Sequence, residues 1–165
     1  MRTKQPESLH TIAFSDCDPF GHLNNGRYID YFLNARELHL NQFYDFSIAQ
    51  YTTTGNAWVV TRNQLAYHRP ARYAEQVHML SRLLYYNEYE LHLEMVMTNA
   101  AREHLKSMYW AKFAHVDART GKRAPHPASF LQLCTEIVYE EAACERENFE
   151  ARVQQLSASF IPAKT

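Results

Sequence analysis

A short polar segment near the start of the chain holds the residues best suited to acid–base or nucleophilic chemistry. Asp16, Asp18 and His22 lie close together, and Asn24 and Asn25 follow them directly. A carboxylate can act as a nucleophile or as a general base, and a histidine exchanges protons near neutral pH. The segment therefore predicts a reactive loop, with the alternative that Asp18 only holds a turn.

A long apolar pattern follows and predicts a helix over residues 25–44. Asn24 is a suitable N-cap because its side chain can accept a hydrogen bond from an early backbone N–H. The side chains expected to be buried are Tyr28, Tyr31, Phe32, Ala35, Leu38 and Leu40. The first N–H groups of a helix are unpaired and carry partial positive charge, which stabilises a developing oxyanion. Acidic side chains and an oxyanion site are thus expected side by side.

The residues around Asp18 are expected to shape the loop. Pro19 fixes φ and Gly21 permits a positive φ, so both indicate a turn. Asp16 could share the reactive role of Asp18, but we interpret it as structural. Cys17 lies between two carboxylates, which disfavour a thiolate, and is expected to be a small buried residue.

His22 has two interpretations. Its ring can orient a substrate, or it can hydrogen-bond to backbone carbonyls and stabilise the loop, which we favour. The other histidines show no spacing typical of a metal site, and the cysteines at positions 17, 134 and 144 form no CxxC pair. We therefore expect no metal, no cofactor and no disulfide framework, as in a reducing cytoplasm.

Alternating and apolar patterns predict several β-strands. They are expected at residues 9–14, 57–67, 76–86, 89–98 and 105–116. In the first of them, Ile12 and Phe14 share one face. Before the second, residues 42–55 form a connection whose part 51–54 is expected to be extended or looped.

Two of these strands make specific predictions about burial. Residues 89–98 alternate between apolar and polar side chains, so we expect one buried and one solvent-exposed face. Residues 105–116 are apolar on both sides, which predicts burial of both faces for part of the strand. The short connections at 87–88 and 99–102 predict antiparallel neighbours.

The composition is that of a globular protein rich in aromatic residues. The chain has 165 residues, of which 46% are hydrophobic and 13% aromatic, and its formal net charge is −1. A charge so close to zero gives no general attraction to nucleic acid or to an acidic membrane surface. The first residues form no apolar signal core, and no apolar window is long enough to span a membrane. We expect no nucleic-acid or membrane partner and a cytoplasmic location.

The length fits one domain with a single core. We place the main domain at residues 1–133 and interpret residues 134–165 as a C-terminal helical extension. Apolar residues there recur at spacings of three and four between many glutamates, which is typical of an amphipathic surface helix. These residues are Tyr139, Ala142, Phe149, Val153 and Leu156, with Arg146 as an interruption.

The order of the elements predicts an α+β fold. One long helix between a first strand and a run of antiparallel strands indicates a curved antiparallel sheet wrapped around one long central helix. The edges of such a sheet would be exposed. Pairing with a second copy is therefore expected, as a homodimer or a homotetramer.

Residues 14–25, FSDCDPFGHLNN, followed by Tyr28 and the pair Ala35-Arg36, carry a resemblance to a known family. The segment resembles the hotdog-fold acyl-CoA thioesterases of the 4-hydroxybenzoyl-CoA thioesterase type. The predicted strand order agrees more loosely with the same family. One departure is Leu33, which stands where the family often has a glutamate before the Ala-Arg pair.

The resemblance implies an acyl-CoA substrate and roles for individual residues. Asp18 would be the catalytic carboxylate, as nucleophile or as general base, with His22 in the same catalytic loop. The backbone N–H near Asn25 would polarise the thioester carbonyl. The implied substrate contacts are Gly21, Asn24 and Tyr28, with Arg69 and Arg72 as candidates for the phosphates of coenzyme A.

Two other functions stay open. A hotdog hydratase or dehydratase would use Asp18 and His22 together for acid–base chemistry on an enoyl thioester. A non-catalytic protein that binds acyl thioesters is the other possibility, because a fold does not determine a function.

Overall fold

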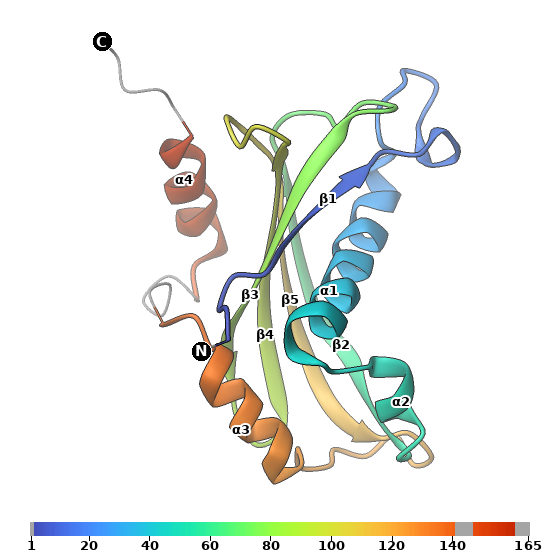
Figure 1. Ribbon diagram of the computed structural model, residues 1–165, viewed down its shortest axis with the longest axis vertical. Helices are drawn as coiled ribbons and strands as arrows, with labels where there is room; N and C mark the ends of the chain where they lie inside the picture. The colour runs from blue at the N-terminus through green and yellow to red at the C-terminus, as the bar shows by residue number, and fades with distance from the viewer. Residues whose placement is uncertain (1, 141–146, 161–165) are drawn as a thin grey trace.

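An antiparallel sheet curves around one long helix at the centre of this protein (Figure 1). The computed structural model describes residues 2–140 and 147–160. The strands are β1 (Glu7–Thr11), β2 (Asn56–Tyr67), β3 (Gln76–Tyr86), β4 (Glu90–Asn99) and β5 (Leu105–Asp117), in the order β1-β3-β4-β5-β2. The helices are α1 (Tyr28–Tyr44), α2 (Ile48–Thr52), α3 (Ala128–Ile137) and α4 (Phe149–Ser159). The predicted α+β architecture and antiparallel neighbours are confirmed. None of the helices within the described residues is long and apolar enough to cross a membrane.

Helix α1 supplies the core that the sheet covers. Phe32 is fully buried, and its ring stacks on Tyr109 of β5 with the ring centroids 5.5 Å apart. Aromatic pairs of this kind add to the free energy of apolar burial. The α-helix begins at Tyr28, and a 3-10 helix at Asn25–Arg27 precedes it. The predicted start at residue 25 is therefore the start of that 3-10 helix.

The buried face of α1 differs in part from the prediction. Tyr31 and Leu38 are half-buried rather than buried. Arg36 and His39 are buried, although both are polar. They face β3, where the Ser81 hydroxyl lies 3.2 Å from Nη1 of Arg36 and 2.8 Å from Nδ1 of His39. The apolar pattern alone does not reveal this polar contact.

Successive residues of β5 pack on opposite faces of the sheet. Tyr109 lies in the core beneath α1, whereas Met108 and Trp110 pack against Phe149 and Val153 of α4. Helix α4 therefore covers the outer face of the sheet, on the side away from α1 (Figure 1). The predicted burial of both faces of this strand is confirmed.

The alternation in β4 predicts a solvent-exposed polar face, and this prediction is wrong. His92, Glu94 and Thr98 are only 3%, 0% and 3% exposed. Arg152 of α4 donates two hydrogen bonds to the Glu94 carboxylate, at 2.8 and 2.9 Å, and Arg82 of β3 donates another at 2.6 Å. The polar face is buried because α4 lies over it and supplies a charged partner.

Two loop segments also differ from their predicted structure. The first strand ends at Thr11, and Phe14 begins a 3-10 helix instead of sharing a strand face with Ile12. Phe14 is 77% exposed. Residues 51–54 are expected to be extended or looped, but they form the end of α2 and the turn after it. The side chain of Ser47 caps the start of this helix.

The C-terminal segment forms two helices on different faces of the sheet. Helix α3 packs Phe130 and Cys134 into the core beneath α1, whereas α4 packs Phe149 and Val153 on the outer face. The domain boundary expected at residue 134 falls within α3 and stays a prediction. Ala142 and Arg146 of the sequence pattern, and also Cys144, lie outside the described residues.

The buried ring of His39 should make the fold less stable at acid pH. Its Nε2 lies 2.7 Å from the Ser8 hydroxyl and its Nδ1 lies 2.8 Å from the Ser81 hydroxyl. Burial, and then the charge of Arg36, lowers the pKa of His39 from 6.5 to about 3. The unfolded chain therefore takes up a proton in a pH range where the folded protein does not. The contribution to stability is complete above pH 6.5 and is lost progressively toward pH 3.

We expect His39 alone to lower the free energy of unfolding by about 1.4 kcal/mol per pH unit below 6.5. Urea unfolding at a series of pH values from 7 down to 5 measures the slope. The variant His39→Gln keeps a donor and an acceptor for the two serines but cannot titrate. Its slope should be shallower by that amount, and equal slopes in the two proteins would contradict the assignment.

Candidate active site

Asp18 lies in a tight loop whose geometry depends on its own side chain. Its Oδ1 accepts hydrogen bonds from the backbone N–H groups of Phe20 at 2.9 Å and His22 at 3.0 Å. Its own N–H donates to the His22 carbonyl at 2.7 Å. Gly21 adopts the predicted positive φ, at 74°, which a side chain would strain. Asp18 thus holds the turn with one oxygen, and its Oδ2 accepts no hydrogen bond from the described residues.

The loop is anchored on the connection between β2 and β3. The Leu23 N–H donates to the Ala71 carbonyl at 2.8 Å, and the Tyr73 N–H donates to the Gly21 carbonyl at 2.9 Å. An isolated antiparallel bridge joins His22 to Arg72 and places them side by side. Within the described part of the chain, His22 makes its hydrogen bonds through its backbone and not through its ring.

Asp16 has structural contacts, in line with its interpretation from the sequence. Its Oδ2 accepts a hydrogen bond from the Tyr31 hydroxyl at 3.0 Å, and its Oδ1 lies 3.8 Å from Nε of Arg27. It ends the 3-10 helix that begins at Phe14 and does not lie in an extended segment. These bonds tie the loop to α1 and leave Asp18 as the more available carboxylate.

Asn24 and Asn25 lie at the N-terminus of the 3-10 helix that leads into α1. The Oδ1 of Asn24 accepts from the Gly26 N–H at 2.9 Å, so Asn24 caps the 3-10 helix rather than α1 itself. The Asn25 carbonyl accepts a hydrogen bond from the Tyr67 hydroxyl at 2.9 Å. The Asn25 N–H has no hydrogen-bond partner among the described residues. This donor is available to a ligand.

Two other expected substrate contacts have different surroundings. Tyr28 is buried, its ring meets that of Tyr67 edge-on at 5.1 Å, and its hydroxyl accepts from the Ala71 N–H at 3.1 Å. Arg69 is exposed just beyond β2, where its backbone N–H donates to the Lys106 carbonyl at 3.2 Å. The structure therefore brings the loop residues and Arg72 together and uses Tyr28 to support the anchor of the loop. Arg69 stays exposed near the end of β2.

Cysteine and metal chemistry receive little support from the described residues. Cys17 is half-buried rather than buried, and burial together with the neighbouring carboxylates raises the pKa of its thiol. Burial raises the pKa of the Cys134 thiol to about 12. Both side chains are therefore poor sources of a thiolate. No group of three or more His, Cys, Asp or Glu side chains in residues 2–140 and 147–160 could hold a metal ion.

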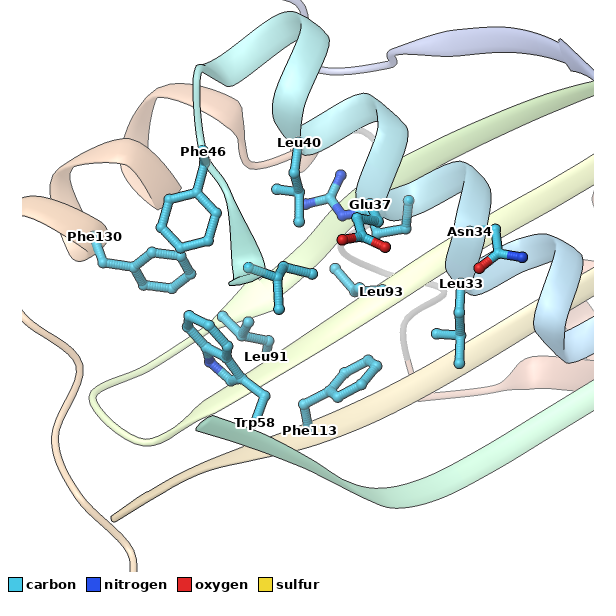
Figure 2. A pocket seen from close by; sticks show the side chains of 12 residues that line it. Leu33, Asn34, Glu37, Leu40, Phe46, Trp58, Leu91, Leu93, Phe113 and Phe130 are labelled. Atoms are coloured by element: carbon cyan, nitrogen blue, oxygen red, sulfur yellow. The ribbon is translucent and has the colours of Figure 1, made fainter. Parts of the chain in front are cut away.

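An apolar pocket of about 270 Å³ lies between α1 and the sheet (Figure 2). Leu33 and Leu40 border it from the helix, and four aromatic side chains face them from other elements. These are Phe46, Trp58, Phe113 and Phe130. Leu33 stands where the resemblance leads one to expect a glutamate, so the pocket is apolar at that position. Its polar members, Asn34, Arg36 and Glu37, also come from α1.

The comparison with protein families decides the class of this protein. A family model described as the thioesterase-like superfamily matches residues 12–133. The chain belongs to this superfamily. The match includes the Asp18 loop, α1 and strands β2 to β5, and it confirms the resemblance found in the sequence. Membership supports thioester hydrolysis as the general reaction.

Solved structures show the fold of this thioesterase-like protein. YbaW, a probable thioesterase from Escherichia coli, is 22% identical with a TM-score of 0.67, over 81% of this chain and 98% of that one. A DHNA-CoA thioesterase from Staphylococcus aureus is 18% identical with a TM-score of 0.69, over 96% and 97%. The hypothetical protein SAV2348 from Staphylococcus aureus, in complex with CoA, is 14% identical with a TM-score of 0.74, over 83% and 85%. The fold is the hotdog fold. Among curated proteins, no match was found.

The sequence patterns of this superfamily member do not reveal its pocket. Leu33, Glu37 and Leu40 recur at helical spacing, so they could have been grouped as one face of α1. The opposite wall combines Trp58 of β2 with Phe130 of α3, and no local pattern links these positions. The pocket exists only because the sheet and α3 fold over the helix.

Proposed function

We propose that this protein is an acyl-CoA thioesterase, which hydrolyses an acyl-CoA to a free acid and CoA. Asp18 is the nucleophile or the general base, and the N–H of Asn25 is the donor to the thioester carbonyl. One observation carries the proposal. The Asp18 carboxylate is held by two backbone N–H groups at Oδ1, while Oδ2 accepts no hydrogen bond within the described residues.

A carboxylate held in this way is oriented before the reaction begins, so little entropy is lost in placing it. As a nucleophile, Oδ2 attacks the carbonyl carbon, the C–S bond breaks and the CoA thiolate leaves. Water then hydrolyses the mixed anhydride to the acid and restores the Asp18 carboxylate. As a general base, Oδ2 instead takes a proton from the attacking water. Both routes leave the two hydrogen bonds at Oδ1 intact.

The N-terminus of the 3-10 helix before α1 supplies the second component of the proposed site, a hydrogen-bond donor. Asn24 occupies the Gly26 N–H with its side chain, whereas the Asn25 N–H has no partner among the described residues. A backbone donor aimed at a developing oxyanion stabilises it more than it stabilises the ground-state carbonyl. The partial positive charge at the start of a helix acts in the same direction.

Coenzyme A is proposed as the thiol part of the substrate. One similar structure was solved in complex with CoA, and another is a DHNA-CoA thioesterase. Arg72 lies beside the loop and Arg69 is exposed nearby in the sequence, so we propose both as contacts for phosphates. Gly21, His22, Asn24 and Tyr28 keep their proposed roles in shaping the loop and the substrate contacts.

Release of free thiol from a panel of acyl-CoAs tests the proposal. The panel should include straight-chain and aromatic acyl groups, and at least one should reach a kcat/KM of about 10⁴ M⁻¹ s⁻¹ or more. Hydration of an enoyl-CoA without hydrolysis of any saturated acyl-CoA would support the hydratase instead. Tight binding of acyl-CoA without either reaction would support the non-catalytic function.

A homodimer or homotetramer is also part of the proposal. Strand β2 is an edge strand of the sheet, and its Val59 and Val60 are 46% and 44% exposed. An exposed edge with apolar side chains can pair with the same strand of a second copy. Light scattering that found only monomers at micromolar concentration would contradict this part.

A further inference from the structure

Arg36 is a buried cation whose hydrogen-bonding capacity is only partly used. Arg36 is only 7% exposed, and its Nη1 donates a hydrogen bond to the Ser81 hydroxyl at 3.2 Å. Its Cζ lies 5.8 Å from the centroid of the Tyr44 ring, which is an attractive cation–π arrangement. Its Nε is buried and has no hydrogen-bond partner among the described residues. A buried donor without an acceptor costs free energy, so a missing acceptor for Nε is expected.

The positive charge of Arg36 also lacks an obvious counter-charge. Within residues 2–140 and 147–160, no carboxylate forms an ion pair with its guanidinium, and the groups that face it are Ser81, Tyr44, His39 and Cys134. His39 is neutral at neutral pH because its pKa is about 3. Buried charges in proteins are normally paired because an isolated one is poorly solvated. An anionic ligand would supply the missing charge.

The apolar pocket is the place from which such a ligand could reach Arg36. Arg36 is one of the residues that line it. Figure 2 shows Leu33, Leu40 and the aromatic side chains around the same pocket. The volume is about 270 Å³. A cavity of about 150 Å³ accommodates benzene, so by proportion this pocket holds about ten carbon atoms. Its size suits an aliphatic chain and excludes a whole coenzyme A.

Glu37 borders the same pocket and has the opposite charge. Figure 2 shows its carboxylate on the helix side of the pocket, between Leu40 and Asn34 in this view. Glu37 is exposed, whereas Arg36 is buried. A charge in contact with water acts through a higher effective dielectric constant and is screened by salt. Arg36 should therefore have a larger effect than Glu37 on binding, and the pocket should prefer an anionic ligand.

We propose that this pocket binds an aliphatic chain of about ten carbon atoms that ends in a carboxylate, and that Arg36 holds the carboxylate. The chain replaces water in the apolar part of the pocket, and a carboxylate oxygen accepts a hydrogen bond from Nε. Two molecules carry this chemistry. One is a free fatty acid, and the other is an acyl-CoA whose acyl group has a second carboxylate at its far end.

The fluorescence of Trp58 gives a direct test of binding, which does not require any hydrolysis. The chain has two tryptophans; Trp58 lines the pocket and Trp110 lies on the outer face of the sheet. Decanoate and 1-decanol are titrated in parallel, because they share a chain length and differ in charge. We expect decanoate to bind at least about tenfold more tightly, which corresponds to one good charge-assisted hydrogen bond.

The variants Arg36→Met and Arg36→Lys separate charge from shape. Arg36→Met keeps an apolar side chain and should reduce the preference for decanoate to less than about twofold, since it removes the cation. Arg36→Lys keeps the charge and should retain a preference. Glu37→Gln is a matched variant at the next position and should raise the affinity for decanoate slightly. Circular dichroism at the same temperature shows that each variant is folded.

Three results would overturn the proposal: equal affinities for decanoate and decanol, no binding of either, or an unchanged preference in Arg36→Met. Hydrolysis then distinguishes the two sources. A lower KM for decanedioyl-CoA than for decanoyl-CoA, lost in Arg36→Met, identifies the far carboxylate of a substrate. Competitive inhibition by decanoate without that difference identifies a free fatty acid. If no acyl-CoA is hydrolysed, the proposed function fails while the fluorescence result stands.

Discussion

Asp18→Asn is expected to lower kcat for acyl-CoA hydrolysis at least about 100-fold, since it removes the carboxylate that attacks or that activates water. The substitution is nearly isosteric. The amide oxygen of asparagine can still accept from the N–H groups of Phe20 and His22, which now bind Oδ1 at 2.9 and 3.0 Å. The loop should therefore keep its conformation, and thermal unfolding should change little.

Asp16→Asn is the matched control for that experiment. Asp16 belongs to the same loop, but its carboxylate is used by Tyr31 and Arg27. The variant should keep kcat within about threefold of the parent protein, because its role is to tie the loop to α1. If Asp18→Asn kept full activity, Asp18 would only hold the turn. If both variants lost activity equally, the shape of the loop would be the cause.

Glu94→Gln is expected to lower the free energy of unfolding by about 3–5 kcal/mol, because it leaves buried guanidinium groups without their anion. The Glu94 side chain is 0% exposed, and the side chains of Arg82 and Arg152 are 11% and 8% exposed. Trp110 donates a further hydrogen bond to Oε2 of Glu94 at 3.1 Å. Urea unfolding at neutral pH measures the loss.

The pKa of Glu94 gives the sign of its pH dependence. Burial opposes ionisation, but the hydrogen bonds and charge of Arg152, with the charge of Arg82, outweigh it and lower the pKa of the carboxyl. The stabilisation is therefore present above the ordinary value of 4.5 and is lost as the pH falls below it. His39 already lowers stability as the pH falls below 6.5, whereas the loss due to Glu94 begins only below 4.5.

Glu90→Gln is the control for the buried network. Glu90 is on the same strand and pairs with Arg123 at 2.8 Å, but the two side chains are 40% and 61% exposed. An exposed ion pair of this kind contributes less than about 1 kcal/mol. A loss in Glu94→Gln no larger than that in Glu90→Gln would show that the network on the outer face does not hold α4 in place.

The elements near Asp18 were largely predictable because they depend on neighbouring residues. Asp18 bonds to N–H groups two and four positions away, Gly21 takes a positive φ, and Asn24 caps the turn that starts at the next residue. Helix α1 and strands β2 to β5 follow from apolar spacing within each segment. Local chemistry of this kind is visible in the order of the residues alone.

The contacts that were missed join segments far apart in the chain. Glu94 and Arg152 are separated by 58 positions, and the alternation in β4 gives no sign that a helix will cover its polar face. Arg36 and Ser81 are separated by 45 positions. For the same reason, the walls of the apolar pocket could not be assembled from patterns in α1, β2 or α3 taken separately.

By itself, the sequence determined the turn around Asp18, the helix that follows it, the strands and the family to which they belong, because these depend on residue type and short-range spacing. Only the tertiary structure decided which polar side chains are buried and with which partners. Burial depends on which elements pack against each other. It placed Glu94 beneath α4 and left Arg36 beside an apolar pocket with an unpaired donor.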